Sequence, residues 1–221
     1  MRRRLLFADR TEAGQLLAEQ LAAMNLAEPL VVALPRGGVP VAAEIAKRLN
    51  APLDVAFVRK LGAPNEPELA IGAVADGQAP ETVLNAKLVR ALGLGEDYIA
   101  AAVARELAAI ERRRGAYERL RPGVEPADRT VVVVDDGVAT GMTMQAALRQ
   151  VRRRRPRGLI AAAPVTSREA ATMLRREADR LVCLGAPRRF GSVGSFYCAF
   201  AQVSDEDVAA LLEEAAARSR A

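Results

Sequence analysis

Two adjacent carboxylates, Asp135 and Asp136, follow a run of four valines, Val131–Val134, and precede a turn rich in glycine and threonine. Four consecutive β-branched residues predict a buried strand, which places both acids at its carboxyl end. Gly137 and Gly141 allow a close backbone approach, and unpaired N–H groups at the start of a following helix attract phosphate. Ligands of open α/β sheets bind beyond the carboxyl ends of the strands, so this segment predicts a ligand site.

The two carboxylates would repel a simple phosphate, so the ligand must offer them something else. A phosphate joined to a polyol resolves the conflict. Backbone N–H groups and the hydroxyls of Thr140 and Thr143 would hold the phosphate. Asp135 and Asp136 would accept hydrogen bonds from sugar hydroxyls or bind a divalent metal. A capped helix after a buried strand is the plain structural alternative.

The segment Val131–Thr143 resembles the phosphoribosyl pyrophosphate motif of the type I phosphoribosyltransferases at its hydrophobic, acidic and Thr-Gly positions. The resemblance implies that Asp135 and Asp136 contact the ribose hydroxyls and hold Mg²⁺, directly or through water. It also implies a loop around the 5′-phosphate, made of Gly137, Val138, Ala139, Thr140, Gly141, Met142 and Thr143. The sequence has neither a Walker loop nor a dinucleotide-binding glycine fingerprint.

A second turn from strand to helix lies earlier, where Pro35-Arg36-Gly37-Gly38 follows the predicted strand Leu30–Leu34. It resembles the family's diphosphate loop, in which a strained or cis peptide often follows the arginine. The resemblance implies that Arg36, Gly37 and Gly38 bind diphosphate and that Arg36 is also catalytic. On turn statistics alone, an ordinary turn explains these residues equally well.

The segment Arg59–Leu69 follows another predicted strand and has the Gly and Pro pattern of an ordered hairpin or a mobile loop. The family has a flexible catalytic loop at the corresponding place. By resemblance, Lys60 is therefore a candidate catalytic residue that neutralises the departing diphosphate. A solvated surface lysine is the alternative.

Half of the aromatic residues of the chain lie within Phe190–Phe200. Phe190, Phe196 and Tyr197 are expected to roof an acceptor pocket, as part of the variable hood that the family places over its acceptor. The hood is expected to comprise residues of about 1–24 and 187–203. A small apolar cluster beside the main core is the alternative.

The elements that must position these residues alternate between short apolar strands and amphipathic helices. This alternation predicts an α/β fold, a parallel sheet with helices on both faces, in a single domain of residues 1–221. Strands are expected at 30–34, 53–58, 70–74, 131–134, 159–163 and 181–184. Helices are expected at 12–24, 39–49, 97–120, 143–154, 167–178 and 205–217, with caps at Thr11, Ser167 and Ser204. The segment 84–121 is expected to form a helical insertion in a core of the phosphoribosyltransferase, Rossmann-like kind.

The amino-acid composition excludes several kinds of catalytic and metal-binding site. The chain of 221 residues has no histidine, which excludes a Ser-His-Asp triad, His-ligated zinc and a histidine general base. No apolar run is long enough for a membrane span, and a cytoplasmic protein is predicted. Cytoplasmic cysteines are usually reduced, so Cys183 and Cys198 are expected to be core thiols and not a disulfide. The net charge of +5 suits anionic ligands or nucleic acid. The run Arg152–Arg155 lies at a predicted helix C-terminus just before Pro156, which favours a solvated helix end over nucleic-acid contact. The run Arg112–Arg114 is open to the same two interpretations, and neither run contains aromatic residues for base stacking.

Taken together, the chain resembles most the bacterial phosphoribosyltransferase-like proteins whose acceptor is not established. The resemblance implies binding of 5-phospho-α-D-ribose 1-diphosphate (PRPP) with Mg²⁺ and transfer of the phosphoribosyl group to a nitrogen acceptor, a nucleobase of nucleotide metabolism. Ala139 replaces an aspartate that the hypoxanthine and guanine branch uses, which argues against those acceptors. The alternative is a non-enzymatic regulator that senses PRPP and binds nucleic acid. A homo-oligomer is compatible with either function.

Overall fold

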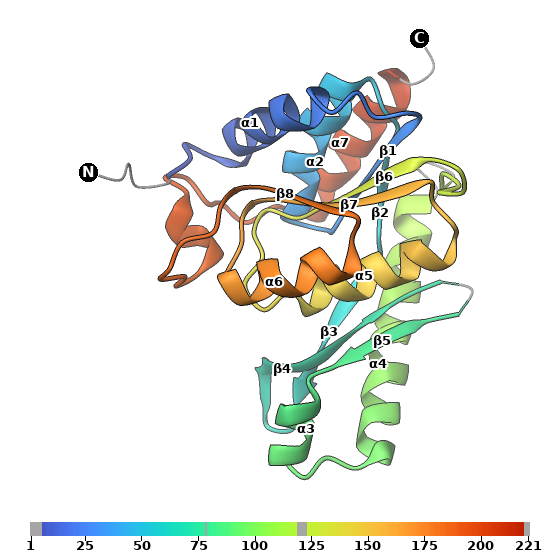
Figure 1. Cartoon of the computed structure of the whole chain (residues 1–221). Coiled ribbons are helices and arrows are strands. Elements are labelled where there is room, and N and C mark those ends of the chain that lie inside the picture. The colour runs from blue at the N-terminus through green and yellow to red at the C-terminus, as the bar shows by residue number, and fades with distance from the viewer. Residues whose placement is uncertain (1–5, 78, 119–122, 219–221) are drawn as a thin grey trace.

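The computed structural model describes residues 6–77, 79–118 and 123–218. Its core is a five-stranded sheet in the order β2-β1-β6-β7-β8, in which every neighbouring pair is parallel. The strands are β1 Pro29–Ala33, β2 Leu53–Val55, β6 Thr130–Val134, β7 Gly158–Val165 and β8 Arg180–Gly185. The predicted α/β fold with a parallel sheet is confirmed (Figure 1).

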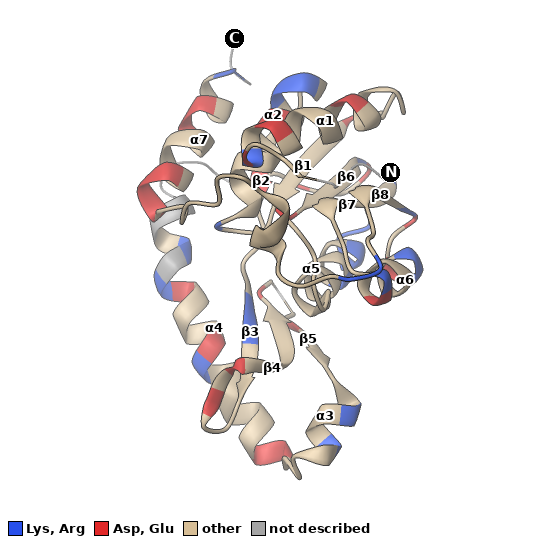
Figure 2. Ribbon diagram, turned by 90° about the vertical axis from the view of Figure 1, so that its left-hand side faces the viewer, with Lys and Arg blue, Asp and Glu red and all other residues tan. Residues whose placement is uncertain are grey.

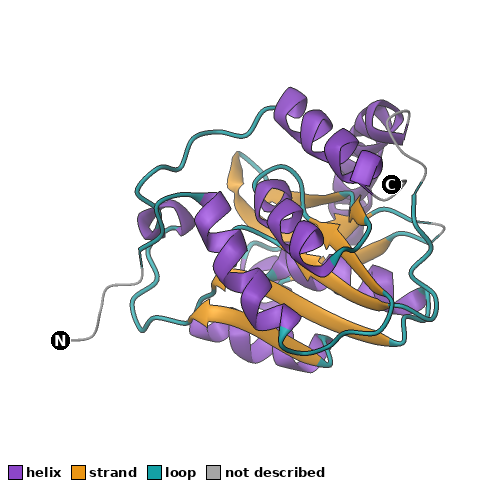
Figure 3. Cartoon of the chain, turned by 90° about the horizontal axis from the view of Figure 1, so that it is seen from above, coloured by secondary structure: helices purple, strands orange, loops and turns teal. Residues whose placement is uncertain are grey.

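Helices cover both faces of this sheet (Figure 1), and Figure 3 shows from above how they lie across the strands. One layer holds α1 Arg10–Ala22, α2 Gly38–Leu49 and α7 Asp205–Arg218, and the other holds α5 Met142–Arg153 and α6 Arg168–Glu177.

The central strand β6 explains why four valines occur in succession. Val132 and Val134 belong to the core cluster with α1, α2 and α7, whereas Val131 and Val133 belong to the cluster with α5 and α6. Successive side chains of a strand point to opposite faces, so a strand buried on both faces needs an apolar residue at every position. The continuous apolar run is therefore the signature of this central place.

A second, antiparallel sheet lies beside the core. It consists of β3 Val58–Ala63, β4 Glu66–Ala75 and β5 Glu81–Leu84, in the order β3-β4-β5. The helices α3 Ala86–Ala91 and α4 Glu96–Glu118 follow it, and a separate cluster around Leu61, Ile71 and Ala102 fills the space between sheet and helices. The segment 84–121, expected to be a helical insertion, contains α3 and α4 up to residue 118, and residues 119–121 lie outside the described ranges.

Two strand assignments from the sequence are corrected. The predicted strand 53–58 is interrupted, because β2 ends at Val55 and β3 begins at Val58. The candidate strand 70–74 is part of β4 and belongs to the antiparallel sheet, not to the parallel core. Apolar runs indicate a strand but do not identify the partner with which it pairs.

The predicted helix caps hold in two cases of three. Ser167 accepts a hydrogen bond from Ala170 N at 3.0 Å, and Ser204 accepts one from Asp207 N at 3.0 Å. The prediction of a cap at Thr11 is wrong, because α1 begins earlier and Asp9 caps it by accepting a hydrogen bond from Glu12 N at 2.9 Å. Asp9 satisfies the same capping rule and makes the helix about half a turn longer than predicted.

The two cysteines are free thiols, Cys183 half-buried and Cys198 exposed, so Cys198 is not the core thiol expected from the sequence. Among the helices that the structure describes, none combines the length and the apolar character needed to cross a membrane.

Candidate functional site

A cavity of about 730 Å³ opens beyond the carboxyl ends of β1 and β6. The core side of it is lined by Leu34 and Pro35 after β1 and by Asp135 and Thr143 after β6. The β3–β4 hairpin and α4 supply the opposite wall, with Lys60 on the hairpin. The fold thus brings Lys60, Asp135 and Thr143, three of the predicted site residues, to one cavity although they are far apart in the sequence.

Asp135 is half-buried and lies at the wall of the cavity. Burial raises the pKa of Asp135 well above its ordinary value, and the neighbouring charge of Asp136 raises it further. The Asp135 Oδ1 atom accepts a hydrogen bond from Asp136 N at 2.9 Å, and the charge of Lys60 opposes the rise in pKa. A cation or hydroxyl donor that enters the cavity would therefore stabilise the ionised form of Asp135.

Asp136 has different partners from Asp135. Its residue is only 9% exposed, and its Oδ2 atom lies 2.8 Å from Arg10 Nε. Its backbone carbonyl accepts a hydrogen bond from the Tyr197 hydroxyl at 2.5 Å. Burial raises the pKa of Asp136, whereas the hydrogen bond and charge of Arg10 lower it. Asp136 does not line the 730 Å³ cavity.

The turn Pro35–Gly38 packs directly against the end of β6. A Cβ atom on Gly37 would lie 2.2 Å from Asp136 Oδ2, and one on Gly38 would lie 2.7 Å from the Val134 carbonyl oxygen. Glycine at both positions is therefore required by close packing. The structure has a cis peptide between Pro35 and Arg36, so it precedes the arginine, which corrects the expected position after it. Arg36 is half-buried and, like Gly37 and Gly38, does not line the cavity.

The predicted phosphate loop is anchored at one end and open at the other. Val138 N donates to Val165 O at 2.9 Å, and the Ser167 hydroxyl donates to Ala139 O at 2.6 Å. Gly141 has φ of +82° and is the N-cap residue of α5, where no side chain caps the helix. The N–H groups of the first turn of α5 have no partner within the helix. They are thus available to an anion at the edge of the cavity.

The two hood segments lie side by side. Phe7 N donates to Phe196 O at 2.8 Å, and Cys198 N donates to Phe7 O at 2.7 Å. The Phe7 and Tyr197 rings are 5.4 Å apart, and Phe196 at the end of the 3₁₀ helix η1 Val193–Phe196 lies 5.2 Å from Phe190. None of Phe190, Phe196 and Tyr197 lines the 730 Å³ cavity. An acceptor-binding role for these rings stays a prediction.

Sequence reasoning missed the contribution of α4 to the cavity wall. Arg59 Nε lies 2.9 Å and Arg105 Nε 3.1 Å from the Glu106 carboxylate, and the Tyr98 hydroxyl donates to Gly62 O at 2.9 Å. Figure 2 shows the basic part of β3 at the junction between the two sheets. Charged residues on a helix look alike in the sequence whether they face water or a site, and only the packing of α4 on the hairpin distinguishes them.

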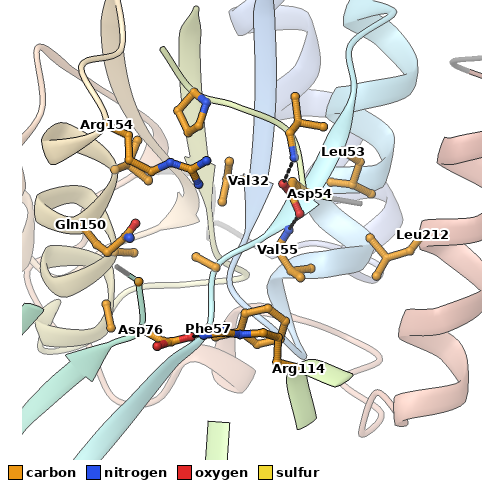
Figure 4. A pocket seen from close by; sticks show the side chains of 18 residues that line it. Val32, Leu53, Asp54, Val55, Phe57, Asp76, Arg114, Gln150, Arg154 and Leu212 are labelled. Atoms are coloured by element: carbon orange, nitrogen blue, oxygen red, sulfur yellow. Dashed lines mark hydrogen bonds and ion pairs between the residues drawn. The ribbon is translucent and has the colours of Figure 1, made fainter. Parts of the chain in front are cut away.

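A second cavity of about 340 Å³ lies at the root of the hairpin. Figure 4 shows Gln150 and Arg154 on one side of it and Leu53 and Leu212 on the other. Its charged groups already have partners in the protein: Asp54 accepts from Val124 N at 2.8 Å, Arg154 pairs with Glu125 at 2.7 Å, and Asp76 pairs with Arg114. The 730 Å³ cavity, which the predicted site residues Lys60, Asp135 and Thr143 line, is the better candidate for a charged substrate.

Comparison with known proteins identifies the class. The model of the phosphoribosyl transferase domain matches residues 10–185, and the chain therefore belongs to that family. A crystal structure of TT1426 from Thermus thermophilus is 45% identical, with a TM-score of 0.80, and the match covers 95% of this chain and 98% of that one. The Mycobacterium tuberculosis H37Rv protein Rv0571c, which carries a provisional phosphoribosyl transferase name, is 41% identical over 95% of this chain.

The chain spans about half the length of the curated relatives that it matches, since the alignment with Rv0571c covers 47% of that protein. The same identity and coverage hold for MT0597 from the CDC 1551 strain.

Proposed function

We propose that the protein binds PRPP with Mg²⁺ and transfers its phosphoribosyl group to a nitrogen acceptor, with release of diphosphate. The observation that carries this proposal is the meeting of Asp135, Thr143 and Lys60 at one 730 Å³ cavity beyond the carboxyl ends of the parallel strands. Family membership supports it, because the matched segment includes all three residues.

In this proposal the residues that line the cavity, together with the turns beside it, bind different parts of PRPP. The open start of α5, from Thr140 to Thr143, receives the 5′-phosphate through backbone N–H groups and hydroxyls. Asp135 accepts hydrogen bonds from the ribose. The turn Arg36–Gly38 and Lys60 from the hairpin bind the diphosphate, whose charge grows as its bond to the ribose breaks.

Such a reaction asks little covalent chemistry of the protein. Carbon 1 of the ribose passes through an oxocarbenium-like state, so the protein's task is to position the reactants and to keep water out. The hairpin and α4 form the wall of the cavity opposite Asp135, which suits that task. A histidine is not needed, in keeping with its absence from the chain.

The residues of the cavity fit a magnesium ion that is bound mainly by the phosphate groups of PRPP. Within residues 6–77, 79–118 and 123–218, no group of three acidic or thiol side chains could bind a metal by itself. Mg²⁺ in phosphate-binding sites usually keeps several waters and binds one or two carboxylates together with substrate phosphates. Asp135 would be the carboxylate that this chain contributes, and the bound ion would offset the charge of the diphosphate.

Calorimetric titration of the protein with PRPP in the presence of Mg²⁺ tests this proposal. Asp135→Asn is expected to weaken PRPP binding by roughly tenfold to a hundredfold, since a hydrogen bond to a charged group is worth about 1.5–3 kcal/mol. Glu213→Gln removes an exposed carboxylate of α7 and is the matched control, with no change expected. The absence of PRPP binding by the wild type would refute the proposed function.

Diphosphate release in the presence of purine and pyrimidine bases would then identify the acceptor. Hypoxanthine and guanine are expected to be poor acceptors, because the Ala139 side chain has no atom that could bond to a purine nitrogen.

A further inference from the structure

We infer that the two motif carboxylates have separate tasks: Asp135 alone meets the substrate, and Arg10 holds the charged side chain of Asp136 away from it. Arg10 is thus a positioning residue for PRPP binding. The inference rests on the proposed function, and it departs from the equal roles that the sequence motif suggests for the two acids.

The contacts of Arg10 fix its guanidinium in one place. Arg10 Nε lies 2.8 Å from Asp136 Oδ2, and another of its nitrogens, Nη1, donates to Ala201 O at 2.7 Å. The guanidinium also lies 3.8 Å from the centre of the Phe200 ring. A planar guanidinium with bonds in two directions and a ring beneath it has little freedom to move. Arg10 therefore connects Asp136 to both hood segments.

The environment makes the pairing of Asp136 with Arg10 electrostatically necessary. Each of the two side chains is only 12% exposed. Removing one partner of such a pair leaves the other as an uncompensated charge in a poorly hydrated place. The guanidinium of Arg10, 2.8 Å from Asp136 Oδ2, is therefore the partner that compensates the carboxylate in this buried place.

The location of Asp136 explains why its charge concerns the substrate. Its Oδ2 atom lies directly over Gly37, in the turn that the proposed function assigns to the diphosphate. An unpaired carboxylate at this position would repel an anionic ligand. Arg10 cancels that charge, and the Tyr197 hydroxyl holds the backbone of Asp136 from the hood side. Asp135, on the cavity side, is then the carboxylate that a ribose can reach.

Charge compensation gives this inference a specific test with four variants: Arg10→Met, Arg10→Lys, Asp136→Asn and the double variant Arg10→Met with Asp136→Asn. The affinity for PRPP with Mg²⁺ is measured by calorimetry at a temperature at which circular dichroism shows each variant to be folded. Arg10→Met should weaken binding at least tenfold, which corresponds to about 1.4 kcal/mol. Arg10→Lys, which keeps the charge but loses the fork of nitrogen atoms, should fall between Arg10→Met and the wild type.

The remaining variants separate repulsion from contact. The loss of affinity for PRPP caused by Asp136→Asn should be at least tenfold smaller than the loss caused by Asp135→Asn, because Asp136→Asn removes no substrate contact. The double variant should bind PRPP more tightly than Arg10→Met, since the repelling charge is gone. A merely structural role would lower the melting temperature and leave the affinity of the folded protein unchanged, and that result would overturn the inference.

Two further outcomes are distinguishable. If Asp136→Asn is as damaging as Asp135→Asn and the double variant is no better than Arg10→Met, then Asp136 contacts the ribose and the inference is wrong while the proposed function stands. If the wild type binds no PRPP, the proposed function fails, and the inference fails with it. Should Arg10→Met not fold, Arg10→Lys and Asp136→Asn decide the question by the same comparison.

Discussion

At Gly37 a single hydrogen atom in place of a side chain allows three parts of the site to meet. A Cβ atom there would lie 2.2 Å from Asp136 Oδ2. That oxygen cannot easily withdraw, because Arg10 holds it at 2.8 Å. We therefore predict that Gly37→Ala lowers the free energy of unfolding by about 1–3 kcal/mol, the usual range for overpacking, and also weakens PRPP binding.

Thermal unfolding and PRPP titration of Gly37→Ala would check this prediction. Gly158→Ala is the matched control, because the nearest atom to its added Cβ, in Thr130, would lie at an ordinary contact distance of 3.6 Å. That variant should unfold within about 0.5 kcal/mol of the wild type. Equal effects of the two substitutions would show that Asp136 is not held in place at Gly37.

The sequence predicted the two acids and their position after β6, but not the difference between them. Asp135 and Asp136 are neighbours in the same motif, so composition and spacing describe them identically. What separates them is Arg10, which lies 126 positions away in the chain. No local pattern contains such a partner, and Arg10 could be expected only to lie somewhere in the hood.

At the scale of elements, one side chain, that of Ser167, joins the start of α6 to the predicted phosphate loop. Ser167 accepts from Ala170 N at 3.0 Å as the cap of α6, and its hydroxyl donates to Ala139 O at 2.6 Å. Ser167→Ala removes both bonds. We predict a loss of about 1 kcal/mol in the free energy of unfolding, the typical cost of a lost cap, and weaker PRPP binding as the loop loosens.

Ser204→Ala is the control for this prediction, because Ser204 caps α7 in the same way without contacting the loop. It should reduce stability by a similar amount and leave the affinity for PRPP unchanged. Equal affinities in the two variants would mean that the bond to Ala139 does not shape the loop.

The elements themselves were largely predictable, and the exceptions have a common cause. β6 and β7 are apolar runs buried on both faces, so their sequences identify them as core strands of a parallel sheet. β8, at the edge of the sheet, is only half-buried, yet its apolar run 181–184 also predicted a strand correctly. The segment 53–58 is also apolar, yet it divides between two sheets, because Val55 and Val58 pair with different strands. Pairing is decided by contacts that are distant in sequence, which a local apolar run does not specify.

At the scale of the whole molecule, the fold gives each of three successive arginines in the sequence a separate acidic partner. Arg152, Arg153 and Arg154 lie together at the end of α5, but each pairs with an acid from a different part of the chain. Arg152 lies 2.7 Å from Asp179, Arg153 2.6 Å from Glu81, and Arg154 2.7 Å from Glu125. The cations also lie at a helix C-terminus, where they interact favourably with the helix dipole. The prediction of a solvated helix end agrees with this geometry better than a nucleic-acid surface does.

We therefore predict that the triple variant Arg152→Gln, Arg153→Gln and Arg154→Gln binds PRPP as the wild type does, because none of the three lines the 730 Å³ cavity. Its free energy of unfolding should fall by roughly 1 kcal/mol, since each exposed pair contributes about 0–1 kcal/mol.

Wild-type binding to duplex DNA should be weak and should fall steeply with salt, as expected of a basic protein without specific contacts. The triple variant Arg175→Gln, Arg176→Gln and Arg180→Gln removes the same charge from exposed positions, so it should reduce DNA binding equally. Fluorescence anisotropy with labelled DNA at several salt concentrations measures this. If the wild type instead bound DNA tightly and sequence-selectively at physiological salt, and only the first triple variant lost this binding, a nucleic-acid-binding regulator would be favoured. Non-specific attraction to a basic surface has no sequence selectivity and would be reduced equally in both variants.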